Sequence, residues 1–313
     1  MNLPRAWLRG TLLALARSES VKALAVSLPM TASVVARFVP GETIADCLAA
    51  VRALAADGLM ATIDYLGEDT TTAEQAAAVR DGYLALLAEL SAARLGDVAE
   101  VSVKLTALGS ALPGGRELAQ RHAREICAAA AAAGTTVTLD AEDHTTTDTA
   151  LAVLDGLRRE FPRTAGVLQA YLRRTPADCE RLAGAGSRIR LCKGAYAEPV
   201  EVAHQSREDV SAAYVACART LLAGDGYPML ATHDPQLLAA IAELARQLGR
   251  APGSYELQLL YGIRSDEQRR LAAAGERVRV YVPFGTDWWG YFIRRLAERP
   301  ANLAFLGRAL LGR

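Results

Sequence analysis

Short apolar runs alternate with amphipathic helical patterns eight times after residue 58. The apolar runs predict strands at 59–65, 98–105, 135–141, 165–171, 188–193, 228–233, 255–260 and 277–283. The patterns that follow them predict helices at 72–93, 116–133, 146–160, 176–184, 199–223, 235–248, 265–274 and 287–299. Regular alternation indicates parallel strands, and eight units are the number that closes a barrel. The sequence therefore predicts an α/β fold of the (β/α)8 TIM-barrel type at 58–313, with a doubly wound open sheet as the alternative.

The first 57 residues have a different pattern, because Ala, Leu and Val recur at helical spacing and no strand is predicted there. We expect 1–57 to form a helical segment packed on or beside the barrel. Near the start, Leu and Trp side chains are interspersed with Arg5, Arg9 and Arg17, as in an amphipathic helix. Such a helix either packs on the domain or lies on a membrane surface. No apolar run is long enough to cross a bilayer.

The composition argues against several classes of protein. The 35 basic and 35 acidic residues balance, so no bulk field attracts the chain to nucleic acid. The five cysteines show no Cys-x-x-Cys spacing, which favours reduced thiols in a cytoplasmic protein over a disulfide framework or a zinc site. No Gly-x-Gly-x-x-Gly or phosphate-loop motif occurs, and no histidine pair has the spacing of a metal site. A Rossmann site, a P-loop and a catalytic metal are therefore not predicted.

Polar or ionisable side chains stand at or near the predicted carboxyl end of each strand. These ends meet at one rim of a barrel, where the chemistry of such folds takes place. The side chains are those of Asp64, Lys104, Asp140, Gln169, Arg190, Lys193, Thr232, His233, Gln258 and Tyr281. Buried charges are costly unless they are paired or liganded. The pattern therefore predicts a polar pocket at this rim.

The last predicted helix carries an arginine pair, Arg294 and Arg295. Tyr291 and Glu298 lie three or four residues away and share a helix face with them. Two arginines can hold a carboxylate through several planar hydrogen bonds. The alternative interpretation is a solvated surface helix with an internal ion pair.

Several separated motifs, taken together, resemble the proline dehydrogenase family of flavoenzymes in its short monofunctional bacterial form. The resemblance runs from about residue 64 to 302. The motifs are Arg-Ile-Arg-Leu-Cys-Lys-Gly-Ala-Tyr-Ala-Glu-Pro at 188–199, Ala-Thr-His-Asp-Pro at 231–235, Tyr-Glu-Leu-Gln-Leu-Leu-Tyr-Gly-Ile-Arg at 255–264, Tyr-Val-Pro-Phe-Gly at 281–285 and Tyr-Phe-Ile-Arg-Arg-Leu-Ala-Glu-Arg-Pro at 291–300.

The resemblance implies a (β/α)8 barrel that holds FAD non-covalently at the carboxyl ends of its strands, with the final helix over the active site. It implies oxidation of L-proline to Δ1-pyrroline-5-carboxylate, with electrons passing from the flavin to a membrane quinone. We therefore expect a cytoplasmic protein that works at the inner face of the membrane. Larger bifunctional relatives carry a fused aldehyde dehydrogenase, whereas this chain resembles the monofunctional form. We therefore expect a separate pyrroline-5-carboxylate dehydrogenase to complete the conversion to glutamate.

The resemblance also implies roles for individual residues, and Asp140, Arg190 and Tyr281 are the expected catalytic ones, with Arg190 near the flavin N5. The expected cofactor contacts are Ala141, Gln169, Arg190, Cys192, Lys193, Gly194, Ala195, Thr232, His233 and Glu298. The expected substrate contacts are Lys104, Arg294, Arg295, Tyr196, Leu260 and Tyr291. Asp64 and Glu68 belong to a first-strand motif whose acid pairs with an arginine of the last helix as a gate.

Two other functions stay open at this point. Lys104 or Lys193 could form a Schiff base in a lyase of the aldolase type. A barrel of this kind could also bind an amino acid without catalysis. The sequence assigns neither a general base nor the residues at the adenosine end of the flavin.

Overall fold

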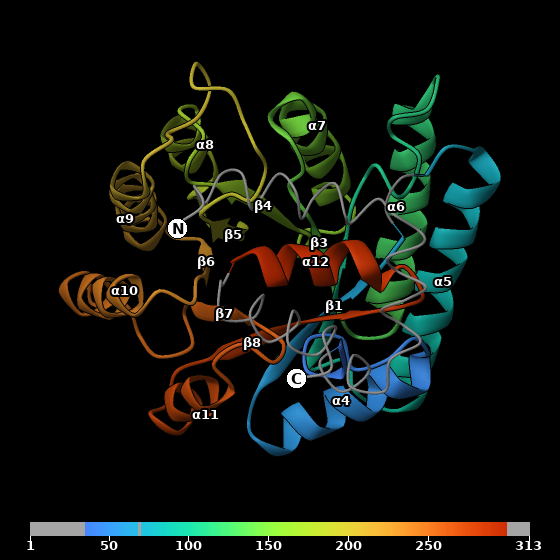
Figure 1. Ribbon diagram of the computed structural model, residues 1–313, viewed down its shortest axis with the longest axis horizontal. Helices are drawn as coiled ribbons and strands as arrows, with labels where there is room; N and C mark the ends of the chain where they lie inside the picture. The colour runs from blue at the N-terminus through green and yellow to red at the C-terminus, as the bar shows by residue number, and fades with distance from the viewer. Residues whose placement is uncertain (1–34, 68–69, 299–313) are drawn as a thin grey trace, which may run out of the picture.

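Eight parallel strands form a closed barrel in the computed structural model, which describes residues 35–67 and 70–298 (Figure 1). The strands are β1 (Met60–Tyr65), β2 (Ala99–Val103), β3 (Val137–Leu139), β4 (Ala165–Gln169), β5 (Arg188–Cys192), β6 (Tyr227–Ala231), β7 (Glu256–Leu260) and β8 (Val278–Phe284). Strand β8 pairs in parallel with β1, and Met60 lies opposite Arg279 in that register. The predicted TIM-type barrel is therefore confirmed, and an open sheet is excluded.

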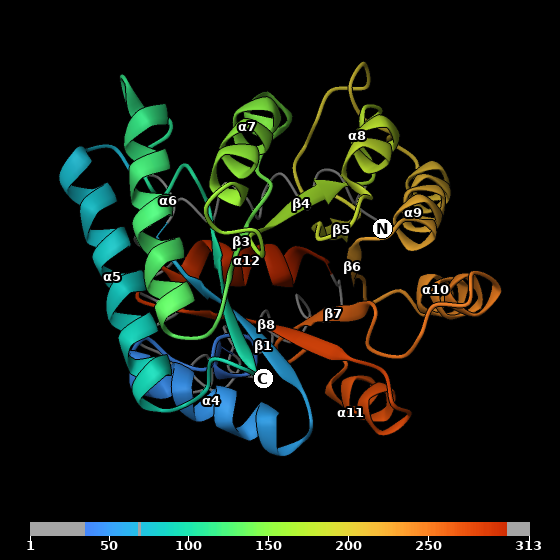
Figure 2. The ribbon, with the colours of Figure 1, turned by 180° about the vertical axis from the view of Figure 1, so that it is seen from behind.

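Helices surround the barrel and cover its outer surface (Figure 2). They are α4 (Ile44–Ala56), α5 (Ala73–Ala92), α6 (Gly115–Ala132), α7 (Thr147–Arg158), α8 (Thr175–Leu182), α9 (Arg207–Ala223), α10 (Pro235–Gln247) and α11 (Ser265–Ala273), followed by α12 (Trp288–Glu298). A short 3₁₀ helix, η1 (His144–Thr146), precedes α7. Capping hydrogen bonds set the first residue of several of these helices. Thr72, for example, caps α5 through a reciprocal pair of hydrogen bonds with Gln75.

The prediction for α9 was wrong at its start. A helix was expected from residue 199, but α9 begins at Arg207. The hydroxyl of Ser206 accepts a hydrogen bond from the backbone N–H of Asp209, and this cap sets the first helical turn. Residues 199–206 instead form a loop that contains an isolated bridge between Ala203 and Leu172.

Two environments alternate along each strand. Ile63, Val101 and Leu191 are fully buried and belong to the hydrophobic core. Arg190, next to Leu191, instead contacts Thr62 and Ser102 on strands that do not neighbour β5 in the sheet. Contacts of that kind can form only across the interior of the barrel. The interior is therefore polar, whereas most TIM barrels fill it with branched apolar side chains.

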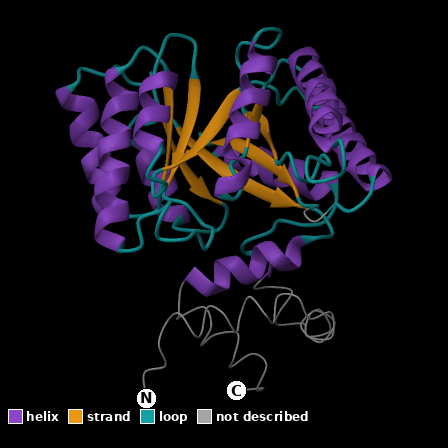
Figure 3. Cartoon of the chain, turned by 90° about the horizontal axis from the view of Figure 1, so that it is seen from above, coloured by secondary structure: helices purple, strands orange, loops and turns teal. Residues whose placement is uncertain are grey.

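Helix α12 lies across the carboxyl ends of the strands, outside the ring of other helices (Figures 1 and 3). Its buried aromatic side chains form a small cluster with Phe38, Val39 and Leu66. Tyr281 of β8 packs against this cluster, so α12 adjoins the end of the barrel where the polar residues were predicted. The expected position of the last helix is thus confirmed.

The N-terminal part of the chain is described from residue 35 onward, and residues 1–34 lie outside the described part. Helix α4 packs Cys47, Leu48, Val51 and Leu54 into the main hydrophobic core. The division into a helical segment at 1–57 and a barrel at 58–313 stays a prediction. Over the described residues, no helix combines the length and the apolarity needed to cross a membrane.

Substitution of two buried phenylalanines can distinguish the stability of the barrel from the packing of α12 against it. Phe284 of β8 is 1% exposed in the main core, and Phe292 of α12 is 0% exposed in the smaller cluster. We expect Phe284→Ala to lower the global free energy of unfolding by about 3–5 kcal/mol, since it leaves a cavity in the barrel wall. Phe292→Ala should mainly increase hydrogen exchange in α12 and leave exchange in β8 unchanged. Equal loss of protection in both elements would contradict this separation.

Candidate active site

Two side chains within strands and two just beyond strand ends form a polar cluster at the carboxyl end of the barrel. The ammonium of Lys104 lies 2.7 Å from Asp64 Oδ2 and 4.0 Å from Asp140 Oδ2. The hydroxyl of Tyr281 lies 2.7 Å from Asp64 Oδ2 and 2.8 Å from Asp140 Oδ2. Asp64 is 2% exposed and Asp140 is 8% exposed. The barrel thus brings together Asp64, Lys104, Asp140 and Tyr281, as the strand-end pattern predicted.

The hydroxyl of Tyr281 is placed between two carboxylates but has only one hydrogen to donate. Burial raises the pKa of this phenol well above its usual value, and the charges of Asp140 and Asp64 raise it further. The hydroxyl is therefore a proton donor shared between two acids and does not ionise near neutral pH. Its ring lies beside the guanidinium of Arg190, whose carbon is 5.4 Å from the ring centroid.

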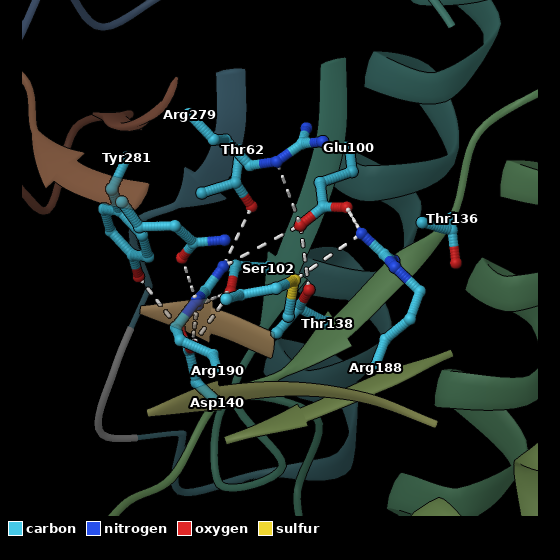
Figure 4. Close-up of polar contacts among 12 residues, drawn as sticks. Thr62, Glu100, Ser102, Thr136, Thr138, Asp140, Arg188, Arg190, Arg279 and Tyr281 are labelled. Atoms are coloured by element: carbon cyan, nitrogen blue, oxygen red, sulfur yellow. Dashed lines mark hydrogen bonds and ion pairs between the residues drawn. The ribbon is translucent and has the colours of Figure 1, made fainter. Parts of the chain in front are cut away.

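Arg190 crosses the barrel interior and is held on several sides (Figure 4). Its Nη1 donates to Asp140 Oδ1 at 2.6 Å and to Ser102 Oγ at 2.9 Å. Its Nε donates to Gln258 Oε1 at 2.6 Å, and Nη2 donates to Thr62 Oγ1 at 3.2 Å. The side chain is 5% exposed. A buried guanidinium with this many partners keeps one orientation, because moving it would break several charge-assisted hydrogen bonds at once.

A second layer of charge lies deeper in the barrel, centred on Glu100 of β2 (Figure 4). Its carboxylate lies 2.8 Å from Arg188 and within 4 Å of Arg190 and Arg279. Burial alone would raise the pKa of Glu100, but Arg279, Arg188 and Arg190 outweigh burial and lower the pKa to about 2. Glu100 therefore stays charged and holds three cations together.

Lys193 and His233 lie at the rim, and hydrogen bonds to neighbouring residues hold their side chains in place. Lys193 Nζ lies 2.9 Å from Asp234 Oδ2 and donates to Ser211 Oγ at 3.4 Å. The hydrogen bond from Lys193 lowers the pKa of Asp234. The backbone N–H of Leu260 donates to His233 Nε2 at 2.8 Å, so the proton of the neutral imidazole is on Nδ1.

Thr232, Gln169 and Cys192 also lie at this rim. The hydroxyl oxygen of Thr232 accepts from the backbone N–H of Asp234 at 3.1 Å and so keeps its own hydrogen to donate. Gln169 Nε2 donates to the carbonyl of Glu142 at 2.7 Å, and Cys192 Sγ lies 3.5 Å from the carbonyl of Leu168. Ala141, next to Glu142, is partly exposed at the end of β3.

The loop after β5 depends on a glycine and a buried acid. Gly194 has a φ of +115°, and a Cβ there would lie 2.2 Å from the ring of Tyr171. Glu198 accepts from the backbone N–H of His144 at 2.9 Å, contacts the ring of His144, and lies 3.4 Å from the hydroxyl of Tyr171. The loop is thereby joined to the ends of β3 and β4. Of the predicted contacts, Ala195 lies in this loop, and Tyr196 is 40% exposed on it.

Helix α12 brings the predicted tyrosine and arginines to the same end of the barrel. The guanidinium carbon of Arg295 is 5.1 Å from the ring centroid of Tyr291, as expected for residues four apart on a helix. Tyr291 is 6% exposed, and Arg294 and Arg295 are partly exposed. Two predicted residues cannot be placed in the site: Glu68 lies outside the described residues, as does the side chain of Glu298.

Thr62, Ser102 and Glu198 are among the side chains that hold the site in place and that sequence reasoning missed. A signal was present for the first two. Thr62 is two residues before Asp64 and Ser102 is two before Lys104, so alternation puts each on the inward face of its strand. No signal pointed to Glu198, because the predicted helix at 199–223 begins directly after it.

The geometry suits chemistry on a small anionic substrate. A buried cation, a partly exposed lysine and a phenol converge at one rim, and a helix with two arginines lies across it. Within the described residues, no three His, Cys, Asp or Glu side chains come together to hold a metal ion. All five cysteines lie within the described residues, and none forms a disulfide.

Comparisons with known proteins identify related chains. The sequence profile of a family described as proline dehydrogenase matches residues 47–308. The chain is 37% identical over 275 residues to proline dehydrogenase 1 of Bacillus subtilis (strain 168), covering 88% of this chain and 90% of that protein. It is 38% identical over 278 residues to proline dehydrogenase of Deinococcus radiodurans, covering 88% and 89%.

Larger proteins also match over part of their length. The bifunctional protein PutA of Escherichia coli (strain K12) is 33% identical, and the match covers 87% of this chain but 24% of that protein. A crystal structure of proline utilization A from Bdellovibrio bacteriovorus, inactivated by N-propargylglycine, superposes with a TM-score of 0.81 at 24% identity. That match covers 94% of this chain and 36% of the larger one, and it shows that the fold is shared.

The charge balance at Glu100 predicts how stability depends on pH. Because its pKa in the folded chain is depressed to about 2, its contribution is fully present above the unfolded value of about 4.3 and is lost as pH falls through the folded value. We expect Glu100→Gln to cost about 3–5 kcal/mol at pH 7, since Arg188 would lose its carboxylate partner inside the barrel. Stability of the variant should also fall less between about pH 4 and pH 2.

Urea unfolding at a series of pH values measures both effects. Glu160→Gln is the matched control, because Glu160 pairs with Arg124 on the exposed surface and its loss should change stability little. A Glu100→Gln variant as stable as the control at pH 7 would contradict the role given to Glu100.

Proposed function

The chain belongs to the proline dehydrogenase family, and we propose that it oxidises L-proline to Δ1-pyrroline-5-carboxylate. Family membership rests on the profile match and on the two relatives that this chain covers almost end to end. The observation that carries the proposal is the cluster at the carboxyl end of the barrel, where Lys104, Arg190 and Tyr281 are held by Asp64 and Asp140.

We propose that FAD is the cofactor and lies at this rim. The residues present fit a flavin in the chemistry of their donors: Arg190 offers a fixed buried cation, Thr232 a hydroxyl hydrogen and Lys193 an ammonium. A bound flavin would supply the two-electron acceptor that removal of two hydrogens from proline needs. Ala141, Gln169, Cys192, Gly194, Ala195 and His233 complete the proposed cofactor contacts, with Glu298 as a further candidate.

The chain's own residues position the substrate and control charge. We propose that Lys104, Arg294 and Arg295 bind the proline carboxylate, and that Tyr196, Leu260 and Tyr291 pack on its ring. We propose that Asp140 and Tyr281 shape the site and keep Arg190 in place, and Asp64 pairs with Lys104. Asp64 and Glu68 are the proposed gate toward the last helix.

A cation fixed before the reaction costs no reorganisation during it. Arg190 meets this condition because Asp140, Ser102 and Gln258 hold its guanidinium in one place. Placed near the flavin N5, as the family resemblance suggests, it would favour negative charge on the acceptor ring.

The wider setting of the enzyme follows from the family resemblance. We propose a membrane quinone as the electron acceptor and a separate dehydrogenase that oxidises the product to glutamate. The proposed place of action is the cytoplasm, at the inner face of the membrane.

The ion pairs weigh against a Schiff-base lyase. Lys104 and Lys193 each lie within 3 Å of a carboxylate, and formation of an imine would convert the amine that makes this ion pair. A barrel that binds an amino acid without catalysis is the second alternative, and it predicts binding without reduction of a flavin.

Anaerobic addition of L-proline to purified protein loaded with FAD tests the proposal. We expect the absorbance of the oxidised flavin to bleach, and D-proline at the same concentration is the control. A protein that cannot be loaded with FAD, or a flavin that stays oxidised in excess L-proline, would end the proposal.

Arg295→Lys should raise the KM for proline about tenfold, which corresponds to ~1.4 kcal/mol of lost binding. The reason is that lysine keeps the charge but cannot form the planar pair of hydrogen bonds that arginine offers a carboxylate. FAD retention, measured as flavin absorbance relative to protein absorbance, should be unchanged. Loss of FAD in step with the loss of proline affinity would place Arg295 at the cofactor instead.

A further inference from the structure

Arg190 and four buried side chains beneath it form a closed ring across the barrel interior. Arg190 Nε donates to Gln258 Oε1 at 2.6 Å, and Gln258 Nε2 donates to Glu256 Oε1 at 2.6 Å. Arg279 Nε donates to the same Glu256 oxygen at 2.7 Å. Glu100 closes the ring, since its Oε1 lies 3.8 Å from Arg279 and 3.9 Å from Arg190. Figure 4 shows Arg190, Arg279 and Glu100 facing one another in this space.

Gln258 can present only its oxygen to Arg190. Its amide nitrogen is committed to Glu256, and Glu256 is in turn fixed by two donors of Arg279. Turning the amide over would aim its N–H groups at the N–H of Arg190 and its oxygen at a carboxylate. Gln258 and Glu256 are 3% and 0% exposed, so water cannot compensate for such a turn.

We propose that Gln258 is a positioning residue for Arg190: Arg279 and Glu256 lock its amide, and the locked amide fixes where the guanidinium points. The inference rests on the proposed function, in which Arg190 supplies the positive field at the flavin. No substrate or cofactor contact is assigned to Gln258 itself.

The neutral amide has a second consequence, because it accepts a hydrogen bond without adding charge. Arg190 already has Asp140 as a close anionic partner, with its Nη1 at 2.6 Å from Oδ1. A second carboxylate at Gln258 would offset more of the positive charge that Arg190 directs to the flavin. Glutamine thus fixes the cation and preserves its field, whereas a glutamate would fix the cation but weaken its field.

Two variants separate the effects of orientation and charge. Gln258→Leu removes the acceptor but adds no charge, and Gln258→Glu keeps an acceptor of the same shape and adds a carboxylate beside Glu256. Thr164→Val is the control. Thr164 is 1% exposed, donates to the carbonyl of Phe161 at 2.8 Å, and lies before β4, away from the carboxyl end. Each FAD-loaded variant is compared with the unmodified chain by anaerobic flavin reduction and by the midpoint potential of the bound flavin.

We expect Gln258→Leu to slow flavin reduction by L-proline at least tenfold with little change in the KM for proline. Gln258→Glu should lower the affinity for reduced relative to oxidised flavin about tenfold, a fall of about 30 mV in a two-electron potential. That fall should grow as pH rises, since two adjacent carboxyls share a proton at low pH and lose it at high pH. Thr164→Val should lose stability without either change.

The outcomes separate this inference from the proposed function. Failure of L-proline to bleach the unmodified protein would refute the proposed function, and with it the positioning role of Gln258. Bleaching of the unmodified protein, with Gln258 variants that lose stability but keep its reduction rate and potential, would overturn the positioning role alone. Should Gln258→Leu not fold, the potential of Gln258→Glu and its pH dependence decide the question, because the carboxylate retains the contact to Arg190.

Discussion

The structure depends on the requirement that every charge buried in a closed barrel must find a partner of opposite sign. Arg188, Arg190 and Arg279 enter an interior that other TIM barrels fill with branched apolar side chains. Glu100, Asp140 and Glu256 meet them there at distances of 2.6 to 2.8 Å. Replacing such pairs with apolar residues often costs nothing in stability. The pairs are therefore better explained by what they do at the rim, where they fix the direction of Arg190.

Much of the fold could be predicted from the sequence because side chains in strands alternate at every second residue, whereas those on one helix face recur at every third or fourth residue. Leu191 between Arg190 and Cys192 marks a strand with one face toward the helices, and the helical patterns between strands show the repeat. The start of α9 could not be predicted in this way. The helical pattern of 199–223 gives no hint that Glu198 is taken up by His144 and Tyr171 at the ends of two earlier strands.

The site could be predicted where a functional side chain stands at or just beyond a strand end, as Asp64 and Lys104 do. It could not be predicted where a polar residue lies in mid-strand and acts through another residue. Ser102 and Glu100 belong to this group, because their partners come from strands far away in sequence. Local patterns show that such residues face inward, but only the closed barrel shows which of them meet. The orientation of Arg190 is a property of the whole ring of strands and not of β5 alone.

The cross-barrel pairs also bear on how such a barrel could be divided. Strands β1 to β4 contribute Asp64, Glu100 and Asp140 to the interior, with Lys104 as the cation among these site residues. Strands β5 to β8 contribute Arg188, Arg190 and Arg279, with Glu256 as their anion. A fragment made of either half would therefore expose an inner surface of predominantly one sign, acidic in the first half and basic in the second. The two surfaces are complementary in charge, so the pairs of Arg188 with Glu100 and of Arg190 with Asp140 hold the two halves of the intact barrel together.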